Sequence, residues 1–455
     1  MVTGLFSFTS FFGTVKAYSE ISGIIASDTT CASANGPYNL TGNVLIDGGV
    51  TVTVEANTVV NLNNNYIRVN GTLIIQPGVT INMATMDSYI QVNGVLSARG
   101  TSDNPIRING AIGYYALIAP PDYSSIIFSA SSIGWDEQTK IGSIIEYAIL
   151  NSTTVSIENS LKLDNNVIDA GISAKNGSPI LYKNTIKAGL AISGGSPTIT
   201  ANTFDGGFIT FYGEDAGHEN VIISNNIISS SKQLTGGISA GIWFGGSWGS
   251  GGHVLVEKNL IMQCYNGIEI FSPNFDDLKT TLIIQNNTIT NNQVAIYVSN
   301  SYVPTVTGNN LEANTVSVKM VSDYSGNSKD INIPNNWWGT TDTAAIDQSI
   351  YDFNDDFSLG KVTYMPILTS ANPLASPDSS VAIQTPLSSP TTTTSEPTSA
   401  TTSASQNPTA TAESGNQPSL NLNWTAIAIV GLLTLIAVLL TIDIIYRRRR
   451  KSTAD

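Results

Sequence analysis

Charged residues are scarce in this chain: Asp, Glu, Lys and Arg together make up 12% of its 455 residues. An ordinary soluble domain carries about a quarter. Surface helices usually draw on Glu and Lys, so the composition favours strands and turns over helices. Arginine is missing between Arg107 and Arg447, and the formal net charge is −14. A body this acidic repels phosphate backbones, which argues against nucleic acid as a partner.

Side chains that bind metals or form disulfides are also few. Cys31 and Cys264 are the only cysteines. They could pair in an oxidising compartment, but two unpaired core residues are the favoured interpretation. His218 and His253 are the only histidines, which excludes a histidine-rich metal site. We therefore expect no metal or other cofactor, apart from the Ca²⁺ alternative considered below.

What the sequence has in abundance is a repeated short unit built on asparagine. The unit is Asn, then a small, polar or apolar residue, then an apolar one, and the stretches around it alternate apolar and polar residues between Gly, Asn and Ser-Pro turns. Its asparagines recur at steps of 18 to 33 residues, at Asn166, Asn184, Asn202, Asn226, Asn259, Asn287 and Asn310. Three short strands with their turns need about 18 to 25 residues per coil. Inward Ile, Val and Leu would then form apolar columns, and the asparagines hydrogen-bonded ladders.

The predicted fold class is therefore all-β, with a right-handed parallel β-helix over residues 38–369. A propeller is the competing all-β architecture, but it needs a motif repeated every 40 to 50 residues or so, and none is visible. No helical periodicity of useful length precedes the C-terminal apolar segment.

These coils resemble the right-handed β-helix repeats of the carbohydrate-binding and sugar-hydrolase superfamily, the pectate-lyase-like fold. Two segments are similar to uncharacterised archaeal secreted or surface β-helix proteins: GSIIEYAIL, from Gly142 to Leu150, and the segment beginning NNWWGTTD, from Asn335 to Leu368. The resemblance implies that the second segment closes the solenoid. It implies little about function, since the fold hosts lyases, hydrolases, adhesins and scaffolds.

The two ends indicate a membrane-anchored surface protein. Residues 1–17 are typical of a short export signal, and residues 370–422 form a Ser/Thr/Pro-rich stalk expected to be disordered and glycosylated. Residues 423–446 predict one transmembrane helix. The basic tail 447–455 places the C-terminus in the cytoplasm and the ectodomain outside the cell membrane.

The closing segment combines aromatic residues with aspartates. Trp337, Trp338, Tyr351 and Phe353 are expected to cover the open apolar end of the last coil. Asp352, Asp355 and Asp356 are expected to remain solvated. The alternative is that five aspartates of the segment bind Ca²⁺ through their oxygens, without the spacing of an EF-hand. They are Asp342, Asp347, Asp352, Asp355 and Asp356.

Catalytic residues are not identified. Glycoside hydrolysis needs paired carboxylates, and the local candidates are Asp276 and Asp277, with His253 upstream. Polygalacturonases place an Asp pair before a Gly-His-Gly and an Arg-x-Lys. Here Gly-Gly-His precedes the pair and no Arg-x-Lys follows, so the two aspartates are interpreted as solvated loop residues. The prediction leans towards a protein that is not an enzyme.

A binding role is favoured instead. The segment GIWFGGSWGSGGH, from Gly241 to His253, is expected to protrude as a flexible loop. Its Trp243, Phe244 and Trp248 could stack on sugar rings, although one or two of these rings could fold onto the coil beneath. We therefore expect a non-catalytic surface protein that binds glycans or contributes to the cell envelope and adhesion. The alternative is a membrane-anchored polysaccharide lyase or glycoside hydrolase.

Overall fold

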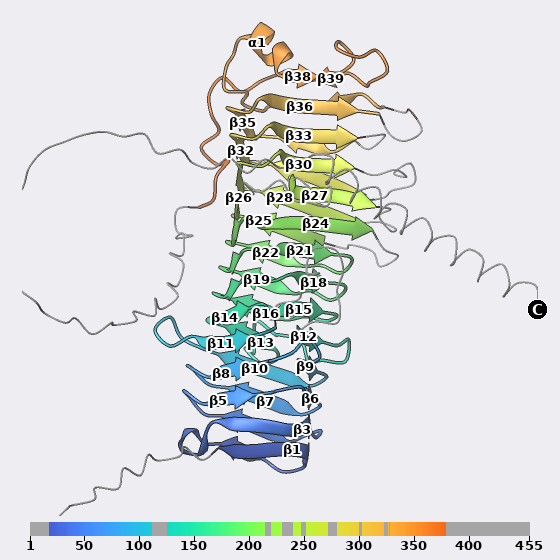
Figure 1. Ribbon diagram of the computed structural model, residues 1–455. Helices are drawn as coiled ribbons and strands as arrows, with labels where there is room; N and C mark the ends of the chain where they lie inside the picture. Colours follow the sequence, from blue (N-terminus) through green and yellow to red (C-terminus); the bar gives the residue numbers. More distant parts are fainter. Residues whose placement is uncertain are drawn as a thin grey trace, which may run out of the picture. The chain divides into compact units, whose positions relative to one another are not determined.

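Parallel strands stacked coil upon coil make up almost the whole described structure (Figure 1). The computed structural model describes residues 18–111, 125–213, 220–229, 240–246, 252–271, 280–299, 303–322, 326 and 328–378. Each coil contributes one strand to each of three faces. The predicted parallel β-solenoid is confirmed. Strand β1, Ser19–Ile25, already pairs with β3, Tyr38–Ile46, so the solenoid begins before the predicted start at residue 38.

The first face is a 12-stranded parallel sheet. Its strands are β2 Thr29–Cys31, β4 Thr51–Val54, β7 Thr72–Ile75, β10 Val95–Arg99, β13 Ile144–Glu146, β16 Lys162–Asp164, β19 Ile180–Tyr182, β22 Thr198–Thr200, β25 Asn220–Ser224, β28 Gly252–Glu257, β31 Thr280–Gln285 and β34 Thr305–Thr307.

The second face follows the first across a sharp corner. Its strands, after the first part of β3, are β5 Val59–Asn61, β8 Thr80–Asn82, β11 Ile106–Asn109, β14 Ala148–Asn151, β17 Val167–Ile168, β20 Thr185–Ile186, β23 Thr203–Asp205, β26 Ile227–Ser229, β29 Leu260–Met262, β32 Thr288–Thr290 and β35 Asn310–Glu312.

The third face starts at the end of β3. Its strands are β6 Ile67–Val69, β9 Tyr89–Val92, β12 Ser125–Phe128, β15 Thr154–Ile157, β18 Ile172–Ala174, β21 Gly189–Ile192, β24 Phe208–Gly213, β27 Ala240–Gly246, β30 Asn266–Phe271, β33 Val294–Ser299, β36 Val316–Val321 and β38 Ile350–Tyr351.

A buried asparagine ladder stabilises the corner between the first and second faces. A residue with positive φ turns the chain there, for example Lys183 at 54°, and the next residue points its amide into the core. Asn184 Nδ2 donates to Leu163 O at 2.9 Å and to Asn202 Oδ1 at 2.9 Å. Asn184 N donates to the same Oδ1 at 2.9 Å, so the amide groups satisfy one another. The ladder comprises Asn166, Asn184, Asn202, Asn226, Asn259, Asn287, Asn309 and Asn336.

The predicted ladder is thus confirmed, with one shift. The sequence pattern assigned Asn310 to it, whereas Asn309 occupies the position. The left-handed corner position, occupied by Asn, Lys or Ala in other coils, is occupied here by Gly308 at φ 70°. The ladder residue directly follows the corner residue, so it is the first asparagine of the Asn309-Asn310 pair and not the second. Cys31 and Cys264 are both buried and do not form a disulfide, in agreement with the favoured interpretation.

In the closing segment, only part of the predicted set of aromatic side chains is buried. Trp338 is buried and meets the Tyr364 ring edge-on with centroids 5.4 Å apart, and Ile346 of α1, Thr343–Gln348, is buried too, whereas Tyr351 and Phe353 remain 39% and 42% exposed. Asp352 is buried rather than solvated because it accepts the backbone N–H groups of residues 354 and 362.

The chain then returns along the first corner. Asn372 donates to Asn286 Oδ1 and Gly308 O, Thr288 donates to Ala375 O, and Asp378 N donates to Asn225 Oδ1. Residues 370–378, which we call the strap, therefore pack on the solenoid although they were assigned to the stalk.

The remaining terminal predictions lie outside the described residues. They are the signal at 1–17, the stalk from residue 379 onward, the transmembrane helix at 423–446 and the tail. Within the part of the chain that the structure describes, no helix has the length and apolar character needed to cross a membrane.

Candidate functional site

One outward column of side chains on the third face changes character along the solenoid. From β15 to β24 it contains small residues, namely Ser156, Ser173, Ala191 and Thr210. From β27 onward the same column contains large aromatic and charged residues, which we call the third-face row: Trp243, Glu269, Tyr297, Lys319 and Tyr351. Figure 1 shows the strands β24, β27, β30, β33 and β36 stacked in this order. Because small side chains occupy this column from β15 to β24, the solenoid fold does not require large side chains there.

The Trp243 indole lies flat on the outer surface of β27. A Cβ atom added at Gly245, two residues along the strand, would fall within the six-membered ring of Trp243. Alternate residues of a strand share a face, so an indole can cover its i+2 neighbour only if that neighbour lacks a side chain. Gly245 thereby allows Trp243 to form a half-buried aromatic platform.

Glu269 follows on the next strand, beside this platform. Its carboxyl group accepts a hydrogen bond from Asn266 Nδ2 at 2.7 Å and one from the Trp243 side chain. Burial raises the pKa of Glu269, and these two hydrogen bonds oppose the rise. Asn266 is almost fully buried, and its Oδ1 has no hydrogen-bond partner among the described residues.

Tyrosine rings continue the row on the other side of the carboxyl group. Tyr297 is the register partner of Glu269 on β33, and Tyr265 is 53% exposed just before β30. Burial raises the pKa of Tyr297, and the negative charge of Glu269 adds to the rise. Farther along, Lys319 Nζ lies 5.7 Å from the centroid of the Tyr351 ring, at cation–π distance.

The predicted aromatic loop has a different structure from the one expected. Residues 241–246 belong to β27 and residues 252–253 to β28, so both ends of the segment are strand and not protruding loop. Phe244 is fully buried and stacks on Phe211 with ring centroids 4.8 Å apart. It cannot contact a ligand, because strand alternation turns it inward when Trp243 faces outward. Trp248 lies outside the described residues.

The weak catalytic candidates are not brought together by the described structure. Asp276 and Asp277 lie outside the described residues, and His253 is exposed on the first face, on β28. The aspartates of the closing segment have structural hydrogen bonds: Asp342 caps α1 and Asp347 accepts from the Tyr364 hydroxyl at 2.6 Å. In the described ranges, no cluster of three or more His, Cys, Asp or Glu side chains could hold a metal ion.

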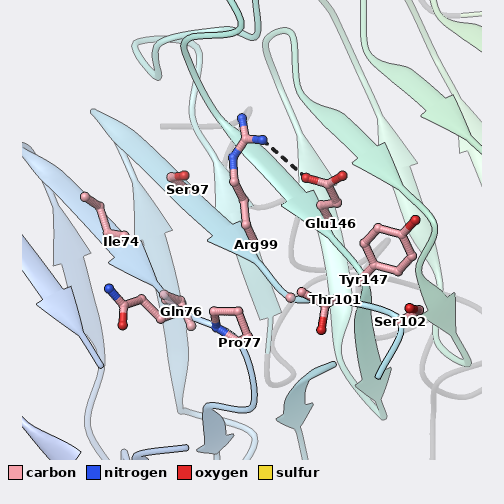
Figure 2. A pocket seen from close by; sticks show the side chains of 11 residues that line it. Ile74, Gln76, Pro77, Ser97, Arg99, Thr101, Ser102, Glu146 and Tyr147 are labelled. Carbon is pink, nitrogen blue, oxygen red and sulfur yellow. Dashed lines mark hydrogen bonds and ion pairs between the residues drawn. The ribbon is translucent and has the colours of Figure 1, made fainter. Parts of the chain in front are cut away.

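A second candidate is a groove of about 640 Å³ on the first face, across β7, β10 and β13 (Figure 2). Gln76, Ser97, Arg99, Glu146 and Tyr147 line it. Its cation is already neutralised, because Arg99 forms a 3.3 Å ion pair with Glu146.

An aromatic ring, that of Trp135, also contacts the guanidinium group of Arg99. The guanidinium of Arg99 lies 5.1 Å from the ring of Trp135, and Lys162 Nζ lies 5.6 Å from the same ring. The Trp135 ring thus lies at cation–π distance from both of these cations. The groove therefore offers a ligand fewer unused groups than the third-face row.

Comparison with known families agrees with the observed topology. The family model for a right-handed β-helix region matches residues 148–337, from the start of β14 to just beyond β37, Ile331–Asn332. The parallel faces and this match show that the chain is a right-handed β-helix repeat protein. No curated protein matches the chain.

Proposed function

We propose that this β-helix repeat protein binds glycans on its third-face row and takes no catalytic part in their turnover. The observation that carries the proposal is the flat Trp243 platform over Gly245, with the Glu269 carboxyl group beside it. Sugar rings stack on aromatic faces through their C–H groups and donate hydroxyl hydrogen bonds to carboxylates.

The spacing of the row suits a linear glycan lying along the stacked coils. Neighbouring strands are about 4.8 Å apart, so Trp243 and Tyr297, two strands apart, offer rings about 10 Å from each other. A chain of sugars that crosses the strands can use both rings and the polar group between them.

We propose binding and not hydrolysis because the third-face row lacks the second carboxyl group that hydrolysis requires. Glycoside hydrolysis uses two carboxyl groups about a sugar ring. Among the described residues the row has Glu269 alone, and Asp276 and Asp277 lie outside them.

Export of this region and its attachment to the cell membrane complete the proposed role. The apolar segment at 424–446 and the basic residues that follow it support a single-pass anchor with the β-helix outside. The protein would then present the row to environmental or cell-surface glycans.

The test is a glycan array probed with the full chain and with two glycine variants. In Gly245→Ala the added methyl group would displace the Trp243 indole from the surface of β27. Gly171→Ala is the matched control, because its Cβ would meet nothing closer than 3.9 Å. We expect binding that Gly245→Ala and Trp243→Ala weaken at least tenfold and that Gly171→Ala leaves unchanged. Silence across the array, or equal binding by all variants, would refute the proposal.

A further inference from the structure

We propose that Glu269 binds a protonated amino group, so that the preferred ligand of the third-face row is a glycan containing free amino sugars. This inference rests on the proposed function and adds the chemical class of the ligand. It is carried by the surroundings of one carboxyl group, described in the next three paragraphs.

The carboxyl group of Glu269 lies between two aromatic side chains. Trp243 is its register partner on one neighbouring strand and Tyr297 on the other, each about 4.8 Å away in the sheet direction. Tyr265 lies just before β30 and is 53% exposed. Aromatic faces attract cations, so rings flanking a carboxylate form an environment suited to an ammonium group.

No cation of the protein neutralises this carboxylate among the residues described. The six ion pairs in this part of the chain involve other carboxylates. Lys319, the cation of the row, is two strands from Glu269, and its Nζ is directed to the ring of Tyr351. A half-buried carboxylate with only neutral donors is stabilised further when a ligand supplies a positive charge.

The buried amide of Asn266 also favours a ligand with a positively charged hydrogen-bond donor. Its Nδ2 is used by Glu269, which leaves its Oδ1 as a buried acceptor without a partner among the described residues. Two acceptor groups thus lie together, and their combined negative potential favours a ligand that brings hydrogen-bond donors and positive charge.

The pH dependence follows from the same groups. Burial raises the pKa of Glu269, so the free protein loses the carboxylate earlier than an exposed glutamate as pH falls. Affinity for an amino glycan should therefore rise with pH until the ligand amine itself loses its proton. Affinity for a neutral glycan should lack this rise. The other titratable groups near Glu269 in the row are Tyr265, Tyr297 and Lys319, and burial raises the pKa of Tyr297, so its hydroxyl keeps its proton over this range.

The experiment compares oligomers of glucosamine with oligomers of N-acetylglucosamine of equal length by calorimetry on the full chain. At about pH 6 we expect roughly tenfold tighter binding of the amine, the size of one charged hydrogen bond. Glu269→Gln should abolish this preference, because the amide keeps the size of the side chain but removes its negative charge, so the affinities for the two oligomers should become equal. Glu312→Gln is the matched control, because Glu312 also accepts an indole N–H, from Trp337 Nε1 at 3.0 Å, but lies on the second face.

Three outcomes separate the inference from the proposed function. Equal affinity for both oligomers, or a preference that survives Glu269→Gln, overturns the inference alone. Binding of the neutral oligomer that tightens as pH falls also overturns it, because a protonated Glu269 would then be the donor. Failure of both oligomers to bind, together with silence on the glycan array, removes the proposed function as well. The pH profile of the wild-type chain decides between these outcomes even if Glu269→Gln folds poorly.

Discussion

Removing one amide from the middle of the buried ladder should destabilise the fold far more than removing an amide from a surface ladder. Asn226 Nδ2 donates to Ile199 O and to Asn259 Oδ1, both at 2.9 Å. Its Oδ1 accepts from Asn202 N at 2.9 Å and Asn202 Nδ2 at 3.0 Å. Asn226→Ala breaks all four bonds and leaves the Asn202 N–H group buried without a partner. One orphaned donor costs about 1 to 3 kcal/mol and each of the three remaining lost bonds about 1 kcal/mol, so we expect a loss of about 4 to 6 kcal/mol.

Urea unfolding followed by far-UV circular dichroism measures this loss, and hydrogen exchange locates it. Coils of a solenoid contact mainly their neighbours, so faster exchange should concentrate at the coils of Asn202 and Asn259. Asn39→Ala is the control. Asn39 ends a half-exposed ladder, where it accepts from Asn61 Nδ2 at 2.7 Å, and its loss should cost under about 1 kcal/mol. Equal losses for the two variants would refute the claim that burial makes the amide ladder important.

Three further predictions concern packing, charge and the strap. Gly94→Ala should destabilise the protein by about 2 kcal/mol or more, measured by urea unfolding, because its Cβ would overlap a backbone carbonyl oxygen of the coil below. Glu137 is hydrogen-bonded by two lysines that lower its pKa to about 2, so the stability it contributes should be complete above about pH 4.5 and lost as pH falls towards 2. Since this carboxylate is 43% exposed and the Lys140 side chain 61% exposed, Lys140→Met should remove less than about 1 kcal/mol, and a pH series of unfolding midpoints tests both. Thr288→Val removes the 2.6 Å hydrogen bond to the strap, so limited proteolysis should cut residues 370–378 faster without a change in global unfolding.

The fold could be predicted because each coil repeats the same local solution. A left-handed corner residue followed by asparagine leaves a visible mark in the sequence, and strand alternation supplies the apolar columns. This sequence pattern does not locate the corner correctly where a different residue occupies the corner position, as at Gly308, or where a coil has no asparagine there. The coils before Asn166 lack this buried ladder, and β1 has no such unit, which is why the predicted boundary fell at residue 38 instead of Ser19.

The candidate site could be predicted only in part, because its residues come from separate coils. Trp243 was identified from its chemistry, but Gly-rich flanks were interpreted as a loop when Gly245 in fact makes room for the indole. Glu269, Tyr297 and Lys319 were missed. Each lies ten residues after the ladder asparagine of its own coil, at Asn259, Asn287 and Asn309, so aligning the coils on the ladder would have placed them in one column.

Adjacent residues of β27 should separate the requirements of binding from those of folding. Phe244 is fully buried against Phe211, so Phe244→Ala should cost about 3 to 5 kcal/mol through lost burial and the cavity it leaves. Trp243 lies outward in a column that holds Ser and Ala in earlier coils, so Trp243→Ala should cost about 1 kcal/mol. Urea unfolding compares their stabilities, and the glycan array compares their binding at a temperature where both variants are folded. If Trp243→Ala proved as destabilising as Phe244→Ala, Trp243 would belong to the core, and its flat position over Gly245 would reflect packing instead of a surface built for a ligand.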